Sequence, residues 1–190
     1  MSKKVIVVGG GIVGLSSAYF LKQEGYEVLV IDKSNLDSGA SYINAGYITP
    51  SHIVSLAAPG MISKGLRYMF DSSSPIYMKP RWDPDFFKWA WSFKKSATSR
   101  KVARSMPLIR DLNLLGRELY DGFKALDFFE DFNLDNIGLL MIYKTVKDSD
   151  HESKTASKAL ELDLEVNHLN FQELQKLEPN IKINASGAFH

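Results

Sequence analysis

The sequence predicts an α/β protein that opens with a strand–helix–strand unit and continues into a mostly helical segment. Three observations support this fold class. An apolar run at 5–8 leads directly into Gly9-x-Gly11-x-x-Gly14, a helical pattern follows over 11–24 with Gly25 at its end, and a second apolar run at 28–31 ends at Asp32. The glycine triplet alone is a weak signal, but in this setting it predicts a Rossmann-like dinucleotide-binding unit.

The glycines and the acid each have a physical role in such a unit. Gly9 allows the tight turn after the first strand, Gly11 lets the backbone approach a pyrophosphate, and Gly14 lets the helix pack close to the strand. The helix N-terminus offers free N–H groups to the diphosphate. Asp32 would accept hydrogen bonds from a ribose diol and repel a 2′-phosphate, which favours FAD or NAD over NADP. The alternative is a glycine-rich turn in an ordinary βαβ unit.

The remaining elements are predicted from the spacing of apolar residues and from the positions of Gly and Pro. Residues 33–55 form a long loop rich in Ser, Asn, Gly and Pro, and loops of this length are usually functional. Helices are expected over 56–70 with a break near Pro59-Gly60, and over 85–95, 108–129 and 149–162, with a linker at 71–84. Strands are expected at 137–143, 164–167 and 186–190, and Asn170 to Glu173 is a capping box that opens a helix ended by Pro179.

Only two strands follow the βαβ rhythm, whereas a doubly wound fold needs several. We therefore expect an incomplete dinucleotide-binding fold, the front part of a larger protein. The expected divisions are the N-terminal part of the cofactor-binding domain at 1–55, a helical insertion at 56–135, and the truncated start of a substrate domain at 136–190.

Composition narrows the function. The formal net charge of +1 gives no electrostatic case for nucleic acid. The absence of cysteine excludes disulfides, thiolate catalysis and cysteine-ligated metal, and it fits a cytoplasmic protein. The four histidines are scattered, so no metal site is expected. No window of the sequence approaches the length of a membrane span.

The segment Gly-Ala-Ser-Tyr-Ile-Asn-Ala-Gly at 39–46 adds a family resemblance. Together with 5–14 and Asp32-Lys33, it resembles the FAD-dependent D-amino-acid oxidase superfamily, nearest the D-amino-acid dehydrogenase branch and its hydroxyproline dehydrogenase relatives. Further short motifs of that branch lie at 57–60, 74–75, 79–81, 83–85 and 179–181. The resemblance implies that the opening unit binds FAD and that the C-terminal half of the flavoprotein is missing here.

The resemblance also implies roles for individual residues. The FAD diphosphate would bind at Gly9, Gly11 and Gly14, near the N–H groups of Ile12 and Val13. The adenosine ribose would bind at Asp32, with Lys33 beside it, and Ser41 would contact the diphosphate or the ribityl chain. The isoalloxazine ring would lie along Asn44, Ala45, Gly46 and Tyr47. The family more often has Glu at the position of Asp32.

The activity implied is oxidative deamination of an amino acid by hydride transfer from Cα to flavin N5. The substrate would be a D-amino acid, glycine or a proline-type secondary amine, and a respiratory acceptor or oxygen would take the electrons. No catalytic residue is identified: His52 is a substrate-side candidate, although a surface-loop histidine is the favoured interpretation. The competing hypotheses are an NAD-dependent oxidoreductase and a non-catalytic fragment of a flavoprotein.

The aromatic segment at 82–93, followed by several Lys and Arg residues, has two interpretations. It is either a peripheral contact with the inner face of the cell membrane or a core helix. The core interpretation is favoured because aromatic stripes usually mark cores.

Overall fold

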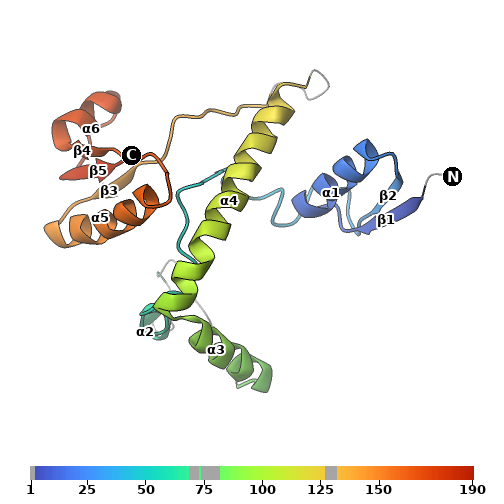
Figure 1. The fold of residues 1–190 in the computed structure, drawn as a ribbon, viewed down its shortest axis with the longest axis horizontal. Helices are drawn as coiled ribbons and strands as arrows, with labels where there is room; N and C mark the ends of the chain where they lie inside the picture. The colour runs from blue at the N-terminus through green and yellow to red at the C-terminus, as the bar shows by residue number, and fades with distance from the viewer. Residues whose placement is uncertain (1–2, 69–72, 74–81, 127–131) are drawn as a thin grey trace. The chain divides into compact units, whose positions relative to one another are not determined.

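The computed structural model of the chain describes residues 3–68, 73, 82–126 and 132–190, and it is mixed α/β (Figure 1). The chain divides into two compact units, residues 1–47 and 48–190, which are described separately. The motifs expected at 74–75 and 79–81, most of the 71–84 linker, and the far ends of the helices expected over 56–70 and 108–129 lie outside the described residues. The domain limits at 55 and 135 stay predictions.

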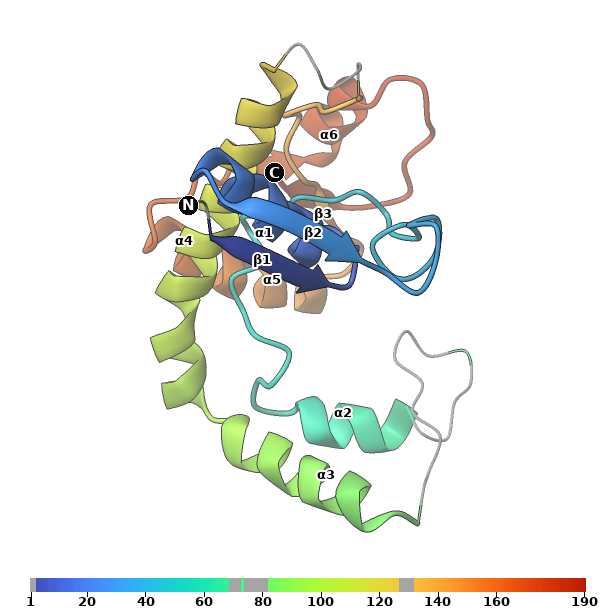
Figure 2. The same cartoon turned by 90° about the vertical axis from the view of Figure 1, so that its right-hand side faces the viewer.

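The first unit is a parallel strand–helix–strand arrangement. Strands β1 (Lys4–Val8) and β2 (Glu27–Ile31) pair in parallel and lie side by side in Figure 2. Helix α1 (Ile12–Gln23) connects them. The helix ends at Gly25, whose φ of 83° and N–H bond to the Lys22 carbonyl form a Schellman motif with the bond from the Tyr26 N–H to the Leu21 carbonyl. The three elements match those that the sequence predicted.

The two faces of this small sheet differ sharply in exposure. Val7 faces α1, since its Cγ1 lies beside the backbone of Gly14. The opposite face carries Ile6, Val8, Leu29 and Ile31, which are 48–83% exposed; we call these four residues the outer sheet face. The register places Ile6 opposite Leu29 and Val8 opposite Ile31, so the four side chains form one apolar patch.

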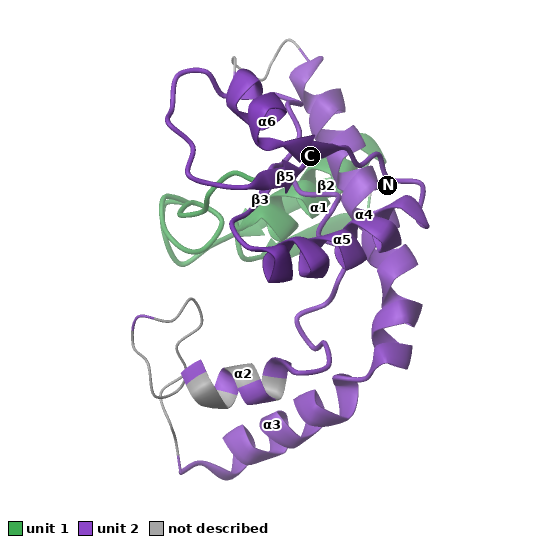
Figure 3. Ribbon diagram, turned by 90° about the vertical axis from the view of Figure 1, so that its left-hand side faces the viewer, with its two compact units in different colours: residues 1–47 green, residues 48–190 purple. Residues whose placement is uncertain are grey.

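The second unit begins with a loop and three helices (Figure 3, purple). Helix α2 (Met61–Tyr68) starts after Gly60, whose φ of 86° is not helical, so the helix expected from residue 56 is corrected. Helix α3 (Pro84–Ser96) matches its prediction and is capped by Asp83, which accepts the Asp85 N–H at 2.9 Å.

Helix α4 (Ser99–Lys124) begins nine residues before its predicted start at 108. Thr98 caps it by accepting the Lys101 N–H at 3.3 Å. Pro107 lies inside the helix without ending it. The two buried residues of α4, Val102 and Met106, both precede the predicted start, because the helix packs through this earlier turn.

The C-terminal part forms a three-stranded antiparallel sheet in the order β3 (Met141–Tyr143), β5 (Gly187–Phe189), β4 (His168–Asn170). Helix α5 (Val146–Leu160) follows β3, and α6 (Phe171–Leu177) follows β4. The strand expected at 137–143 is confirmed only in its last three residues. The strand expected at 164–167 is wrong in its bounds: Asp163 turns the chain with a φ of 57°, Asn167 exchanges two backbone hydrogen bonds with His190, and β4 itself spans 168–170.

The capping box at Asn170 is confirmed. The Asn170 side chain accepts the N–H groups of Gln172 and Glu173 at 2.8 and 3.0 Å, and Glu173 accepts the Asn170 N–H at 2.8 Å. Three N–H groups at the start of α6 thus have side-chain acceptors.

The apolar core of the second unit joins the loop after Tyr47 to two helices. Ile53, Val102, Met106 and Ala159 are buried against one another. Arg110 fixes the end of α5 from α4 by donating to the Leu162 carbonyl at 2.8 Å. The loop that precedes α2 is therefore anchored by packing.

The favoured interpretation of the aromatic segment, a core helix, is corrected by the structure. No residue of α3 is buried, and Trp91 is 58% exposed. The rings pack on one another instead, with Phe86 stacked on Trp89 at 5.9 Å and the Lys94 ammonium 5.5 Å from the Trp91 ring.

Candidate functional site

The glycine turn between β1 and α1 has the backbone geometry that its sequence predicts. Gly9 has a φ of 103°, a conformation that side chains disfavour, and its N–H extends the strand ladder by donating to the Ile31 carbonyl at 2.8 Å. A Cβ at Gly14 would collide with the Gly9 carbonyl oxygen and lie 3.3 Å from Cγ1 of Val7. Gly14 therefore permits the close approach of α1 to the strand.

Asp32 lies directly after β2 and reaches the glycine turn. Its Oδ2 accepts the Gly10 N–H at 2.7 Å, and its Oδ1 accepts both the N–H of Ser34 at 2.8 Å and the hydroxyl of Ser34 at 2.7 Å. These bonds, that from Gly10 first, lower the pKa of Asp32 from 3.8 to about 2. The residue is therefore a fixed carboxylate at the end of the strand at neutral pH.

The N-terminus of α1 faces the loop that follows β2. The Ile12 N–H donates to Oγ of Ser41 at 2.9 Å, and a Cβ at Gly11 would lie only 3.1 Å from that oxygen. Within the described part of the chain, the N–H groups of Val13 and Gly14 have no hydrogen-bond acceptor. Two free donors and a serine hydroxyl thus meet where the helix dipole is positive.

A cleft of about 400 Å³ lies between the start of α1, Asp32 and Ser41. Its lining includes five residues predicted for cofactor binding: Gly11, Ile12, Asp32, Lys33 and Ser41. Gly9, Val13 and Gly14 are not among the lining residues. The structure thus brings these five residues together at one cleft, and their role in binding a cofactor stays a prediction.

The other predicted residues lie outside this cleft. The side-chain N–H of Asn44 donates to the Ser41 carbonyl at 2.7 Å, and its Oδ1 accepts the Gly46 N–H at 2.7 Å, so this stretch is an ordered turn. Ala45 belongs to the same turn, and Tyr47 is 78% exposed. His52 belongs to the second unit, where Nδ1 lies 2.9 Å from Oγ1 of Thr49.

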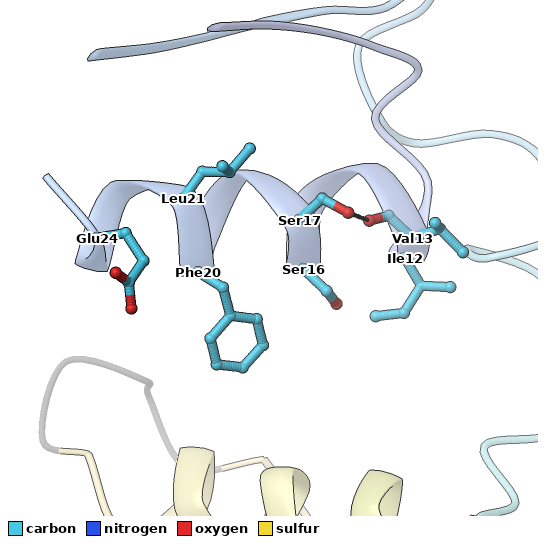
Figure 4. Close-up of a pocket in the computed structure, with 7 residues that line it drawn as sticks. All are labelled: Ile12, Val13, Ser16, Ser17, Phe20, Leu21 and Glu24. Atoms are coloured by element: carbon cyan, nitrogen blue, oxygen red, sulfur yellow. Dashed lines mark hydrogen bonds between the residues drawn. The ribbon is translucent and has the colours of Figure 1, made fainter. Parts of the chain in front are cut away.

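A larger hollow of about 710 Å³ runs along α1 (Figure 4). All seven lining residues come from this one helix, and in the close-up Ile12, Ser16, Phe20 and Glu24 project to the same side. The Ser17 hydroxyl donates a hydrogen bond to the Val13 carbonyl oxygen at 2.7 Å. The hollow lacks converging polar donors, so it does not suit a diphosphate.

Eight residues that line the cleft were not among those predicted to bind the cofactor: Gly10, Leu15, Ser34, Leu36, Ser38, Gly39, Ala40 and Tyr42. Gly10 supplies the N–H that holds Asp32. Leu36 packs directly on Gly10 and has a φ of 66°. A signal for Ser34 existed, because a Ser two residues after an Asp commonly closes a turn on the carboxylate.

The chain belongs to the DAO family of FAD-dependent oxidoreductases, whose sequence model matches residues 4–190. It is 31% identical over 188 residues to a D-amino acid dehydrogenase of Helicobacter pylori, across 99% of this chain and 44% of the relative. A D-amino acid dehydrogenase 2 of Ralstonia nicotianae is 30% identical over 142 residues, across 74% of this chain and 33% of the relative. The chain thus spans less than half the length of these relatives, and no solved structure matches it. The predicted resemblance is confirmed.

Neither α4 nor any other described helix combines the length and apolarity required to cross a bilayer. Among the described residues, no three His, Asp or Glu side chains are grouped as metal ligands would be.

Proposed function

We propose that this chain forms the FAD-binding part of a flavoprotein that oxidatively deaminates an amino acid. The observation that carries the proposal is the cleft where the N-terminus of α1, the Ser41 hydroxyl and the Asp32 carboxylate meet, in a chain of an FAD-dependent family. The family supports FAD over NAD, to which Asp32 alone is equally suited.

The donor set suits a dinucleotide. The N–H groups of Val13 and Gly14 would hold the diphosphate, and Asp32 would hold the adenosine ribose. Oγ of Ser41 already accepts the Ile12 N–H, so its own proton is free to point at a phosphate oxygen. When bound, the flavin supplies the hydride acceptor for the substrate Cα–H.

The names of the relatives support a D-amino acid as substrate, with glycine and proline-type secondary amines as further members of the class. A respiratory acceptor or oxygen would take up the electrons. We retain His52 as a candidate substrate-side group, exposed on its loop and hydrogen-bonded only to a threonine in the described part of the chain. Asn44, Ala45, Gly46 and Tyr47 remain the proposed passage along the flavin ring.

A second candidate, a non-catalytic piece of a flavoprotein, is favoured by one observation. The outer sheet face leaves four large apolar side chains in solvent, and α1 carries further exposed apolar residues. Further polypeptide packed on these surfaces would cover them and complete the unit. The remaining half of the flavoprotein would then be a partner of this chain.

The test is to titrate FAD into the purified 190-residue chain and into its longest natural form, followed by visible absorbance and flavin fluorescence. Reduction of the bound flavin by D-amino acids, glycine and proline is then recorded with and without a dye acceptor. We expect the longest form to be yellow and to be bleached by one of these amines. A protein that never retains FAD refutes the proposal, whereas a yellow but unreactive one supports the second candidate.

A further inference from the structure

The turn after β2 ties Asp32 into a chain of hydrogen bonds. The Leu36 N–H donates to Oγ of Ser34 at 3.3 Å, and the Ser34 hydroxyl in turn donates to Oδ1 of Asp32 at 2.7 Å. Because Oγ accepts from Leu36, its proton is directed at the carboxylate. In the hydrogen bond between these two side chains, the Ser34 hydroxyl is therefore the donor and the Asp32 carboxylate is the acceptor.

The network is also held from the side of the glycine turn. The Gly10 N–H, from the end of the neighbouring strand, occupies Oδ2 at 2.7 Å. The Leu36 side chain lies against Gly10, where a Cβ would displace the end of that side chain. Leu36 keeps a φ of 66°, which bulky residues rarely adopt, so the turn is built around this contact.

The accepting capacity of Asp32 can be counted. A carboxylate offers about four lone-pair sites, two on each oxygen. Oδ1 takes two donors from Ser34 and Oδ2 takes one from Gly10. One site, on Oδ2, is therefore left for a ligand.

From this count we infer that Ser34 is a positioning residue which restricts Asp32 to a single ribose hydroxyl, although a free carboxylate would accept both hydroxyls of the diol. The inference rests on the proposed function, because it concerns how the same cleft holds adenosine. It makes Ser34 a determinant of which ribose hydroxyl is required.

The test compares ADP, 2′-deoxy-ADP and 3′-deoxy-ADP by calorimetric titration of the 190-residue chain. In the parent chain, one deoxy compound should bind like ADP and the other about ten-fold more weakly. In Ser34→Ala, a site on Oδ1 becomes free, so both deoxy compounds should bind more weakly than ADP. Ser157→Ala, which alters an exposed serine of α5 in the second unit, should behave like the parent.

A second measurement does not depend on nucleotide binding. An NMR titration of the Asp32 carboxyl should show a raised pKa in Ser34→Ala and no change in Ser157→Ala. If the pKa does not rise, or if the parent chain loses affinity equally with both deoxy compounds, the role of Ser34 is overturned. If no variant binds ADP although the pKa responds, the ribose restriction is overturned and the hydrogen-bond network stands, while the proposed function is decided separately by FAD retention in the longest natural form.

Discussion

Replacing Gly14 with alanine tests whether the close approach of α1 to the glycine turn determines the site. The added Cβ would collide with the Gly9 carbonyl oxygen and crowd the Val7 side chain. Neither neighbour yields easily, because one is backbone held at a φ of 103° and the other is a β-branched residue of β1. The start of α1 must therefore move away from the turn.

The magnitude is a balance of two effects. Alanine is favoured over glycine in a helix interior by about 1 kcal/mol, whereas overpacking costs about 1–3 kcal/mol. We expect Gly14→Ala to lower the free energy of unfolding of the first unit by up to about 2 kcal/mol after this offset. Since the Val13 and Gly14 N–H groups move with the helix, ADP affinity should fall about ten-fold.

The assay is urea denaturation followed through the NMR signals of β1 and β2, together with ADP titration. Gly116→Ala in α4 is the matched control, since a Cβ there meets nothing within 4 Å. It should stabilise the second unit by about 0.5–1 kcal/mol through helix propensity alone. A Gly14→Ala chain that gains stability in the same way and binds ADP normally would refute the close-approach argument.

Four further outcomes are expected. The pKa of Asp32 in the folded chain is about 2, below its ordinary value of 3.8. Its stabilising effect on the first unit is therefore fully present above pH 3.8 and is lost as the pH falls through about 2. Acid titration followed by NMR should show this loss of stability in the parent chain and not in Asp32→Asn. Ile53→Ala should destabilise the second unit by about 2–5 kcal/mol in urea, against less than about 1 kcal/mol for Leu112→Ala at an exposed site. Asn170→Ala should cost about 1 kcal/mol in the same measurement by removing the capping box. If α3 is a membrane contact, the chain should float with anionic vesicles at low salt and be released by added salt, and a chain that stays at the bottom of the gradient excludes that interpretation.

Sequence reasoning succeeded where the signal is local. The glycine spacing, the apolar runs and the position of Gly25 determine the first unit, because each acts within a few residues of its own place in the chain. The Asn170 capping box succeeded for the same reason. In the candidate site, the positions of Asp32 and Ser41 beside the helix N-terminus were predictable from the motifs alone.

Reasoning failed where a distant contact decides the local conformation. His168 becomes a strand residue because β5, some twenty residues later, pairs with it. The start of α4 was missed because Val102 and Met106 pack on Ile53, a residue of a loop far upstream. The bond from Gly10 to Asp32 joins the ends of two strands, and it is visible only once they pair.

The parallel register of β1 and β2 has a consequence for folding. Val8 pairs with Ile31, so the residues that follow them, Gly9 and Gly10 on one strand and Asp32 on the other, meet as the strands align. A slip of one residue would separate Asp32 from Gly10 and turn the valines of the inner face outward. Strand alignment and assembly of the cleft are therefore one cooperative event. A ligand that binds the cleft should then slow the amide hydrogen exchange of β1, because binding stabilises the aligned pair of strands.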